Sequence, residues 1–435
     1  MIRKALLLAV FAAGVSIAVP ASSQRSPDAL RVDPVRLERR LQELGRIGRN
    51  ARGGIDRPAF GSADVKARET VIGWMREIGL EVRVDAAGNI IGGEPVRLTA
   101  AGPPLILGSH IDSVLNGGMF DGALGVVAAL ECFQVLRESG LARRHPLEIV
   151  VFADEEGGSI GSKAMIGELP TAALDSPGPS GASVRDGIRA IGGNPDRLAG
   201  ASRRGERIRA YIELHIEQGG KLEAKKTAIG IVEGIVGIRR YEAVVEGISN
   251  HAGTTPMDGR KDALLAASRL VLAVNRIVTA LPGAHVGTVG RLLVEPNVPN
   301  VIPGRVVMTI ELRDLSEEVI SSLYELIVRE AGTIERSTGT KISFTPVLPP
   351  SLPAPTDPDV RAIIAGAAAA LGLSAMVMPS GAGHDAQNMA RLAPIGMIFV
   401  PSQGGISHSP GEYSSPRDVV NGANCLLQTV IRLER

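Results

Sequence analysis

The stretch from Leu105 to Glu156 constrains the possible folds of this chain more than any other part of the sequence. Two apolar runs, Leu105–Gly108 and Leu147–Ala153, have the length and the continuous apolar character of strands that are buried on both faces. Between them, Gly122–Ser139 has the composition of a helix, which ends at Gly140. The sequence therefore predicts a βαβ unit with parallel strands, and an α/β fold.

Acidic and imidazole side chains cluster where these elements end or begin. They are His110, Asp112, Asp121, Glu155 and Glu156. Open α/β sheets bind ligands beyond the carboxyl ends of their strands, and one imidazole among several carboxylates suits a divalent transition metal, with zinc as first choice. The alternatives are a core histidine at His110 and a solvated acidic turn at Asp154–Glu156. The turn is the weaker interpretation, because these acidic residues directly end a buried strand.

Two later strands lead to further histidines. Ala210–Leu214 is apolar and ends at His215, and the predicted strand Ile395–Ser402 leads to His408. Most of the histidines, unlike His145 and His285, lie in motifs flanked by glycine or acidic residues. They are His110, His215, His251, His384 and His408. This distribution favours metal binding by His110, His215 and His408. His384 either takes part in chemistry or holds its own loop.

The length of 435 residues favours two domains. Near Gly230 the pattern changes to βαββαβ, which is typical of a split βαβ sandwich. Within it, the strand Arg305–Arg313 alternates apolar and polar residues, and a long helix is expected to begin near Pro256 with Thr254 or Thr255 as its cap. We place this small domain at residues 236–348, inserted between residues 25–235 and 349–435 of a discontinuous larger domain.

The first residues have the composition of an export signal. A short positive segment precedes the apolar run Ala5–Val19, and small residues follow it, so residues 1–24 are predicted to be a cleaved signal peptide and the protein to be exported, to the periplasm. No other segment is apolar for long enough to predict a membrane span in the mature chain. Cys132 and Cys425 are predicted to be buried thiols or, in an exported protein, a disulfide.

Charge excludes some partners. The formal net charge is +1 and the chain has no basic block, so nothing in its electrostatics supports binding to nucleic acid or to an anionic membrane.

Several motifs, taken in order, resemble one family along nearly the whole mature chain. The motifs are GSHIDSVLNGGMFDGALGV, FADEEGGS, ELHIEQG, NHAGTTPM, PNVPNVIPG followed by LRD, SGAGHDA, and SHSPGE. They resemble the di-zinc amidohydrolases that cleave N-carbamoyl-L-amino acids, allantoate and related ureido acids, the carbamoylase branch of the aminoacylase/aminopeptidase superfamily. The resemblance implies a mixed-sheet, di-zinc aminopeptidase-like catalytic domain with an inserted α+β, ferredoxin-like domain that serves as lid and dimerisation domain.

The resemblance also implies roles for the residues of the large domain. Asp121 would bridge two divalent ions, with His110 and His215 completing one site and Glu156 and His408 the other. The ions would be zinc, with manganese, cobalt or nickel as alternatives. Glu155 would be the general base, and Asp112 would orient the imidazole of His110.

Four further residues are implied as substrate contacts. Gln218 would hydrogen-bond the ureido or amide group, and Asn300 and Arg313 would bind a carboxylate, although a bland surface role is the ordinary expectation for Arg313. His251 would stabilise the oxyanion of the reaction or would cap a local turn. The resemblance implies a homodimer, in which His251 could act in the active site of the other subunit.

The sequence thus predicts a metal-dependent hydrolase of linear amide or ureido C–N bonds. The preferred substrate is an N-carbamoyl-L-amino acid, which would give the amino acid, carbon dioxide and ammonia, with allantoate or another ureido acid next. An exported aminoacylase or dipeptidase is the second enzymatic interpretation. A binding protein on a degenerate hydrolase scaffold is the alternative from another class, and the complete ligand set with Glu155 argues against it.

Overall fold

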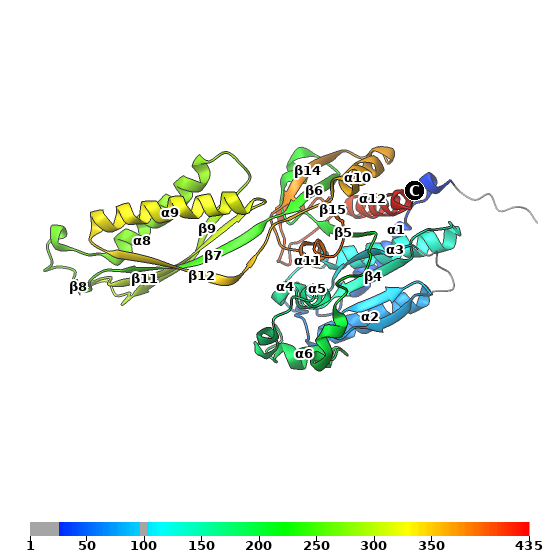
Figure 1. Cartoon of the computed structure of the whole chain (residues 1–435), viewed down its shortest axis with the longest axis horizontal. Helices are drawn as coiled ribbons and strands as arrows, with labels where there is room; N and C mark the ends of the chain where they lie inside the picture. Colours follow the sequence, from blue (N-terminus) through cyan, green and yellow to red (C-terminus); the bar gives the residue numbers. More distant parts are fainter. Residues whose placement is uncertain (1–25, 96–101, 435) are drawn as a thin grey trace, which may run out of the picture.

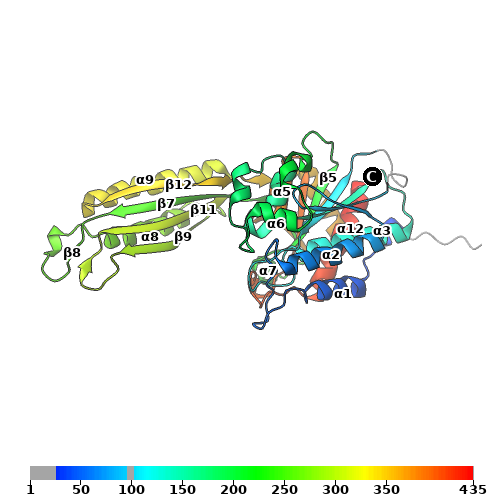
Figure 2. The ribbon, with the colours of Figure 1, turned by 90° about the horizontal axis from the view of Figure 1, so that it is seen from below.

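The computed structural model describes residues 26–95 and 102–434, so the predicted signal peptide lies outside the described residues. Figures 1 and 2 show two parts of unequal size. The larger part contains a sheet with helices packed around it. The smaller part is long and narrow, and it projects away from the larger part.

The large part is built on a nine-stranded sheet with the order β1-β2-β4-β3-β5-β15-β6-β13, in which β14 also pairs with β6. Its centre is parallel, because β3 pairs in parallel with β4 and β5, and β15 pairs in parallel with β5. Antiparallel strands at both sides make the sheet mixed. The strands are β1 (Glu81–Val84), β2 (Ile90–Gly93), β3 (Leu105–His110), β4 (Leu147–Phe152), β5 (Ala210–Ile216), β6 (Ile229–Ile235), β13 (Ala354–Pro355), β14 (Ala375–Ser380) and β15 (Ile395–Val400).

Helices cover this sheet, and α3 is the most central of them. It connects the parallel strands β3 and β4, contacts β3, β4 and β5, and is covered in turn by α1 and α12, which explains why it is apolar almost all round. The predicted βαβ unit is confirmed. The helices are α1 (Pro34–Leu44), α2 (Ser62–Glu77), α3 (Ala123–Ser139), α4 (Glu155–Gly158), α5 (Ile160–Met165), α6 (Val184–Ala190), α7 (Lys221–Lys225), α10 (Pro358–Ala370), α11 (Asp385–Met389) and α12 (Pro416–Leu433).

The small part has the element order βαββαβ. Its four-stranded antiparallel sheet has the order β12-β7-β11-β9, and α8 and α9 pack against it. This is a split βαβ, ferredoxin-like topology, as predicted. The elements are β7 (Gly237–Glu246), α8 (Ala263–Ala280), β9 (Val286–Glu295), β11 (Arg305–Asp314), α9 (Glu317–Thr338) and β12 (Lys341–Ser351), with a small ribbon of β8 (Asn250–His251) and β10 (Val301–Ile302).

Alternation along β11 builds the core of the small part. Val306, Met308, Ile310 and Leu312 are at most 1% exposed and pack with the apolar faces of α8 and α9. By length and composition α8 is apolar enough to cross a membrane, but one of its faces is buried in this core. The apolar side chains on this face of α8 therefore form part of the core of the small part.

The predicted start of the long helix is wrong. The helix α8 begins at Ala263, and its cap is Asp262, whose Oδ1 accepts hydrogen bonds from the N–H groups of Leu264 and Leu265 at 2.9 and 3.0 Å. Pro256 instead has an extended backbone, with φ −55° and ψ 151°. The carboxylate of Asp262 satisfies two N–H groups that the first turn would otherwise leave unpaired.

The chain crosses between the two parts at two adjacent places. Val236 connects β6 to β7, and Leu352 and Pro353 connect β12 to β13. The side-chain amide of Gln387, on α11, donates to the backbone oxygens of Val236 and Leu352 at 2.9 and 2.7 Å. Gln387 therefore joins the two crossing segments to each other and to the large part.

Both cysteines are free and buried. Of the two predicted states, the structure has the buried thiols, and burial raises the pKa of Cys425 to about 12, which keeps this thiol protonated.

Candidate active site

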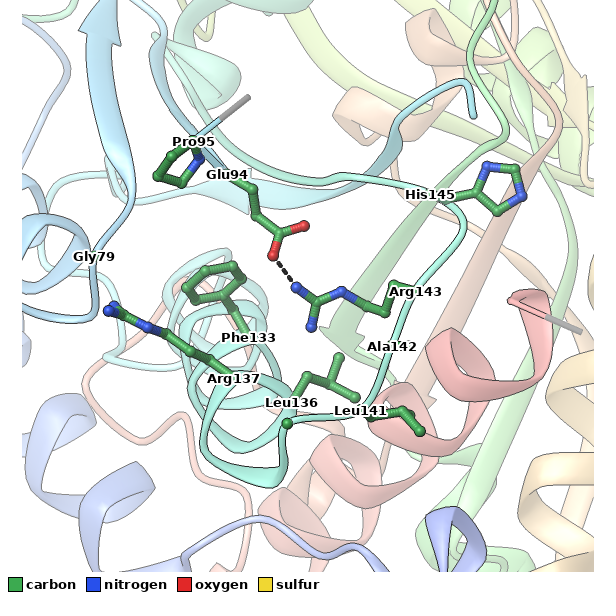
Figure 3. Close-up of a pocket in the computed structure, with 11 residues that line it drawn as sticks. Gly79, Glu94, Pro95, Phe133, Leu136, Arg137, Leu141, Ala142, Arg143 and His145 are labelled. Carbon is green, nitrogen blue, oxygen red and sulfur yellow. Dashed lines mark hydrogen bonds and ion pairs between the residues drawn. The ribbon is translucent and has the colours of Figure 1, made fainter. Parts of the chain in front are cut away.

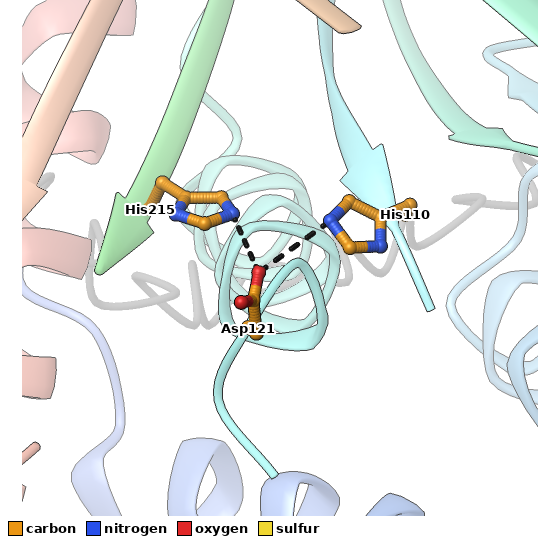
Figure 4. A group of neighbouring side chains, drawn as sticks. All are labelled: His110, Asp121 and His215. Atoms are coloured by element: carbon orange, nitrogen blue, oxygen red, sulfur yellow. Dashed lines mark ion pairs between the residues drawn. The ribbon is translucent and has the colours of Figure 1, made fainter. Parts of the chain in front are cut away.

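The carboxyl ends of β3, β4 and β5 lie side by side, and they carry the predicted ligands. His110 ends β3 and His215 lies in β5, so the parallel pairing of the strands brings the two imidazoles to the same edge of the sheet. Asp121 stands just before α3, between these strands. Figure 4 shows both imidazoles pointing toward its carboxylate.

Asp121 is the centre of two groups of side chains. Its Oδ1 lies 3.1 Å from Nε2 of His215 and 3.7 Å from Nε2 of His110. Its Oδ2 lies 3.2 Å from Nε2 of His408, and that nitrogen lies 3.6 Å from Oε2 of Glu156. The ligand atoms of each group lie within 4.8 Å of one another. The structure thus brings together all five side chains that the sequence predicts as ligands.

Backbone oxygens fix the two buried imidazoles. Nδ1 of His110 lies 3.1 Å from the backbone oxygen of Asp112, and Nδ1 of His215 lies 2.9 Å from that of Ile216. A carbonyl oxygen only accepts, so in both rings Nδ1 carries the proton. In the neutral rings the lone pair is then on Nε2, which faces Asp121, as in a metal-ligating histidine.

The donor set fits divalent cations. Imidazole nitrogens and carboxylate oxygens are the ligands that zinc and related metals prefer, and one carboxylate shared by two groups is typical of two-metal sites. Oε1 of Glu156 is buried and has no hydrogen-bond partner among the described residues. A buried carboxylate oxygen without a partner is costly unless a cation binds beside it.

The pKa values of the ligand side chains also indicate a site for cations. Burial, followed by the charge of Asp121, raises the pKa of Glu156 to about 7. The hydrogen bond to Asp121 raises the pKa of His408 to about 9. Burial alone would lower the pKa of His110, but Glu155 and the other nearby carboxylates outweigh it and raise this pKa well above its usual range. Without metal, protons therefore occupy the positions at which a cation would compensate the carboxylates.

Asp112 positions the two neighbouring glutamates. Asp154 adopts a left-handed conformation, with φ 57° and ψ 52°, and turns the chain from β4 into α4. The carboxylate of Asp112 then accepts the N–H groups of Glu155 and Glu156 at 3.3 and 3.1 Å. It also lies 3.5 Å from Nδ1 of His110, so one carboxylate contacts both the imidazole and the turn that carries the glutamates.

Glu155 faces the group of ligands that contains His110, whereas its neighbour Glu156 belongs to the group that contains His408. Its Oε2 lies 3.7 Å from Nε2 of His110, and its side chain is 11% exposed. Burial raises its pKa well above the usual range of a glutamate. A carboxyl group at this position, next to the ligands but with a high proton affinity, suits a general base.

Gln218 lies at the site. It follows β5 in a left-handed conformation, with φ 57°, and its backbone N–H donates to Oγ of Ser402 at 3.1 Å. Its Nε2 donates to Oδ2 of Asp121 at 2.8 Å, whereas its Oε1 is buried and has no hydrogen-bond partner among the described residues.

The small-domain residues are not brought into the site of the same chain. His251 and Asn300 are exposed and adjacent, because β8 pairs with β10 and the N–H of Ala252 donates to the backbone oxygen of Asn300. Figures 1 and 2 both place β8 at the end of the small domain that is remote from the large one. Nδ1 of His251 accepts the N–H groups of Gly253 and Thr254 at 3.0 and 3.2 Å, which is the local turn contact that the sequence left as an alternative.

Arg313 lies at the opposite end of the small domain. Its Nη1 donates to the backbone oxygen of Gly381, in the large domain, at 2.7 Å, and its Nε pairs with Glu311. The strand β11 separates it from the end that holds Asn300. The strand from Arg305 to Arg313 spans about 26 Å, at about 3.3 Å for each step from one residue to the next. Asn300 and Arg313 of one chain therefore do not form a single carboxylate clamp.

The sequence analysis did not predict Glu213, which lies in β5 two residues before the ligand His215. Its carboxylate accepts hydrogen bonds from Ser109, Tyr211 and the N–H of Ala386 at 2.8, 2.9 and 3.2 Å. The signal was available, because Glu213 lies two residues before His215 and so shares its face of the strand. Its oxygens are fully engaged, so its role is to anchor neighbouring strands.

His384 holds its own loop. Its ring lies edge-on to the ring of His215, with 4.4 Å between centroids, and its Nε2 is 2.9 Å from Oγ of Ser380. With Glu213 and His215 it forms a third group of possible ligands. This group is less suited to a metal, because the Glu213 oxygens and the His384 Nε2 already have hydrogen-bond partners.

A cavity of about 310 Å³ lies away from the site (Figure 3). Its lining includes Phe133, Arg137 and Arg143, of which Arg143 pairs with Glu94. Arg137 is near the carboxyl end of α3, whereas Asp121 precedes the amino end. The cavity therefore lies at the other end of the helix from the ligands.

Comparisons with known proteins agree with this geometry. Residues 106–432 match Peptidase family M20/M25/M40. The chain is 41% identical over 406 residues to the N-carbamoyl-L-amino acid amidohydrolase of Geobacillus stearothermophilus, covering 92% of this chain and 98% of that protein. It is 37% identical over 402 residues to the allantoate amidohydrolase of Bacillus subtilis, covering 90% and 96%.

Solved structures show the same relationship. The crystal structure of an amidase of the hydantoinase/carbamoylase family from Burkholderia multivorans is similar with a TM-score of 0.86 and 35% identity, over 93% of this chain and 99% of that one. Matches of this length and identity, together with the cluster around Asp121, confirm the resemblance and a metal-dependent amide hydrolase. The chain belongs to Peptidase family M20/M25/M40 and, within it, to the hydantoinase/carbamoylase amidohydrolases, which hydrolyse C–N bonds other than peptide bonds.

Proposed function

We propose that this enzyme hydrolyses N-carbamoyl-L-amino acids to the amino acid, carbon dioxide and ammonia. The observation that carries the proposal is the position of Asp121, each of whose carboxylate oxygens faces a different group of ligands, with Glu155 beside one of them. The similarity to N-carbamoyl-L-amino acid amidohydrolases over nine-tenths of the chain supports this choice of substrate.

His110, His215 and Asp121 would hold one divalent ion, and Asp121, Glu156 and His408 a second. Zinc is our first choice, with manganese, cobalt or nickel as alternatives. When bound, such ions lower the pKa of a coordinated water and polarise the substrate carbonyl. The side chain of His408 is 50% exposed. The ion held by Asp121, Glu156 and His408 would therefore be reachable from solvent.

Glu155 performs the proton transfers. Its carboxylate takes a proton from the water that attacks the ureido carbon, and it returns this proton to the nitrogen of the C–N bond that breaks. Asp112 holds the backbone of Glu155 so that its side chain faces the ligands. One water is consumed for each amino acid, carbon dioxide and ammonia released, so the atoms balance.

The substrate contacts follow from what each side chain offers. Gln218 would turn its unpartnered Oε1 to the N–H groups of the ureido moiety. Arg313 would give up its contact with Gly381 to bind the substrate carboxylate through its guanidinium. His251 and Asn300 would complete the pocket from a second subunit, with His251 stabilising the developing oxyanion.

We propose a homodimer formed through the small domain. The strand β9 is an edge of the small sheet, and several of its apolar side chains are exposed. They are Val286, Leu292 and Leu293, at 51, 39 and 47%. An exposed apolar edge strand is a ready site for pairing with another chain. Light scattering of the purified protein should give the mass of two chains, and a fully active monomer would exclude a contribution of His251 across subunits.

We also propose that the enzyme is exported, because residues 1–24 have the composition of a signal peptide. Fractionation of the producing cells would test this: the activity should be recovered outside the cytoplasm, in a chain that lacks these residues.

A panel of substrates tests the function. Metal-reconstituted protein would be given N-carbamoyl-amino acids and allantoate, with ammonia release as readout, and N-acetyl-amino acids and dipeptides, with amine release as readout. Ammonia from carbamoyl compounds alone is the expected result. Allantoate is the second candidate, which the Bacillus subtilis relative favours. Turnover of acyl or peptide substrates alone would contradict the proposal.

A further inference from the structure

Glu412 is a buried carboxylate that contacts the central ligand. It is 5% exposed and lies in the C-terminal SHSPGE segment. Its Oε1 accepts the backbone N–H groups of Phe120 and Asp121 at 2.9 and 3.0 Å. These bonds join parts of the chain that lie about 290 residues apart. Glu412 therefore holds the backbone from which the carboxylate of Asp121 projects.

Ser407 links Glu412 to the same carboxylate. Its Oγ lies 2.9 Å from Oε2 of Glu412 and 3.1 Å from Oδ2 of Asp121. This is the oxygen of Asp121 that faces His408, the residue next to Ser407. In addition, the backbone N–H of Glu412 donates to the backbone oxygen of Ser409 at 3.0 Å, which closes the turn that directly follows His408. Glu412 thus contacts both the segment that carries Asp121 and the segment that carries His408.

Gly118 shows how closely the two segments fit together. A Cβ atom built on Gly118 would overlap the carboxylate and the Cβ of Glu412. Only a glycine leaves room for the carboxylate to reach the N–H groups of Phe120 and Asp121. Gly118 and the glutamate of SHSPGE are therefore the two sides of one contact.

We propose that Glu412 is a positioning residue for the metal held by Asp121, Glu156 and His408. It sets the distance between Asp121 and His408, through two backbone N–H groups on one side and through Ser407 on the other. The inference rests on the proposed metal-dependent function. Removal of such a supporting group costs about 10- to 100-fold in metal affinity. The ion between His110 and His215 should be affected less, because the imidazoles of these two residues are fixed by backbone oxygens of their own segments.

The test is metal binding to apo-protein, measured by competition with a chelating indicator and by the visible spectrum of bound Co²⁺. Glu412→Ala should bind one ion with an affinity closer to that of the wild type and a second ion about 10- to 100-fold more weakly. Its Co²⁺ spectrum should lose the same component as that of His408→Ala. Glu412→Gln should stay close to the wild type, because the amide oxygen still accepts the two N–H groups and the amide nitrogen donates to Ser407.

Glu434 offers a matched control. Its Oε2 also accepts two consecutive backbone N–H groups, those of Arg144 and His145, from a segment about 290 residues away, at 2.6 and 3.2 Å. It lies far from the ligands, so Glu434→Ala should leave both ions bound as in the wild type. Ser407→Ala provides a milder change to the same contact, because it removes one hydroxyl and adds no atom, and it should weaken the second ion even if Glu412→Ala folds poorly.

The outcomes are separable. Two ions bound with wild-type affinity by Glu412→Ala and Ser407→Ala would overturn the role of Glu412 alone. Equal weakening by Glu434→Ala would also overturn it, because the effect would then be one of general stability. A wild-type protein that binds no divalent ion would overturn both this inference and the proposed function. The readout is independent of the substrate that the enzyme cleaves.

Discussion

Glu155 and Glu156 are neighbours in the chain, yet they face different partners. The short helix α4 turns one side chain toward His110 and the other toward His408, and Asp112 holds both backbone N–H groups. A carboxylate that binds a metal gives up its proton to the ion, whereas an uncoordinated carboxylate beside the metal still has a free oxygen that can accept a proton. These different surroundings are the reason why we propose different roles for two residues of the same chemistry.

Glu155→Gln should abolish turnover and leave metal binding intact. The amide cannot take a proton from water, and a missing general base costs on the order of 10²- to 10⁴-fold in rate. The side chain keeps its size, so the ligands stay in place. Steady-state kinetics with a metal assay on the same sample would measure both effects, with the exposed Glu69→Gln as control. Unchanged turnover in Glu155→Gln would contradict the mechanism.

Metal affinity should rise with pH. In the metal-free protein the pKa of Glu156 is about 7 and that of His408 about 9, and a bound ion must displace both protons. The affinity for this ion should rise about 100-fold per pH unit below pH 7, about tenfold per unit between pH 7 and 9, and level off above pH 9. Indicator competition at pH 6, 8 and 10 would measure it. An affinity that is independent of pH would exclude these residues as ligands.

Residues of the site differ in how far the sequence reveals them. His110 and His215 were predictable, because strand ends in α/β sheets carry ligands, and Asp121 because it lies in the segment that connects such a strand end to the next helix. Glu412 was not predictable, since its contact with the backbone of Asp121 depends on a close approach of distant segments and has no spacing that a sequence pattern records. For His251, the resemblance left open whether it acts in its own subunit or in the other one, and the fold adds that it lies away from the site of its own chain.

At the scale of elements, burial decided which predictions held. The runs that became β3, β4 and β15 are buried at almost every position, and the alternation of β11 fits a sheet with one face on the core. The start of α8 was misplaced because Pro256 and Thr254 form one plausible helix start and Asp262 another. Local sequence offers both, and packing against β7 and β11 selects the second.

Asp262→Ala should therefore destabilise the small domain, by about 1 kcal/mol, the usual cost of losing a helix cap. Thr254→Ala is the matched control, since a helix that started at Pro256 would depend on that residue instead. Thermal unfolding of both variants, followed by circular dichroism, would compare them. A larger loss of stability in Thr254→Ala would show that the cap has been assigned to the wrong residue.

At the scale of the whole molecule, the small domain divides its predicted substrate contacts between its two ends. Arg313 lies where the chain crosses into the large domain and contacts Gly381, whereas His251 lies in β8, at the remote end. One chain cannot bring both to the same site, because the strands between them are rigid parts of a packed sheet. A twofold dimer would solve this, since each remote end could then reach the partner's large domain.

Complementation between inactive variants tests this arrangement. Glu155→Gln and His251→Ala should each be inactive or nearly so as homodimers. If Glu155 of one chain works with His251 of the other, a mixed dimer contains one site with both residues intact and one site with neither. After subunit exchange at equal concentrations, half of the dimers are mixed, so the mixture should recover about a quarter of the wild-type activity. If both residues act within one chain, every site in the mixture carries a substitution and no activity returns.

A double variant that carries both substitutions, mixed with wild type in the same ratio, is the control for exchange itself. In that mixture each mixed dimer holds two sites with one defect each, so activity should fall to about a quarter of that of the same total amount of wild-type protein if the residues act in trans, and only to about a half if they act in cis.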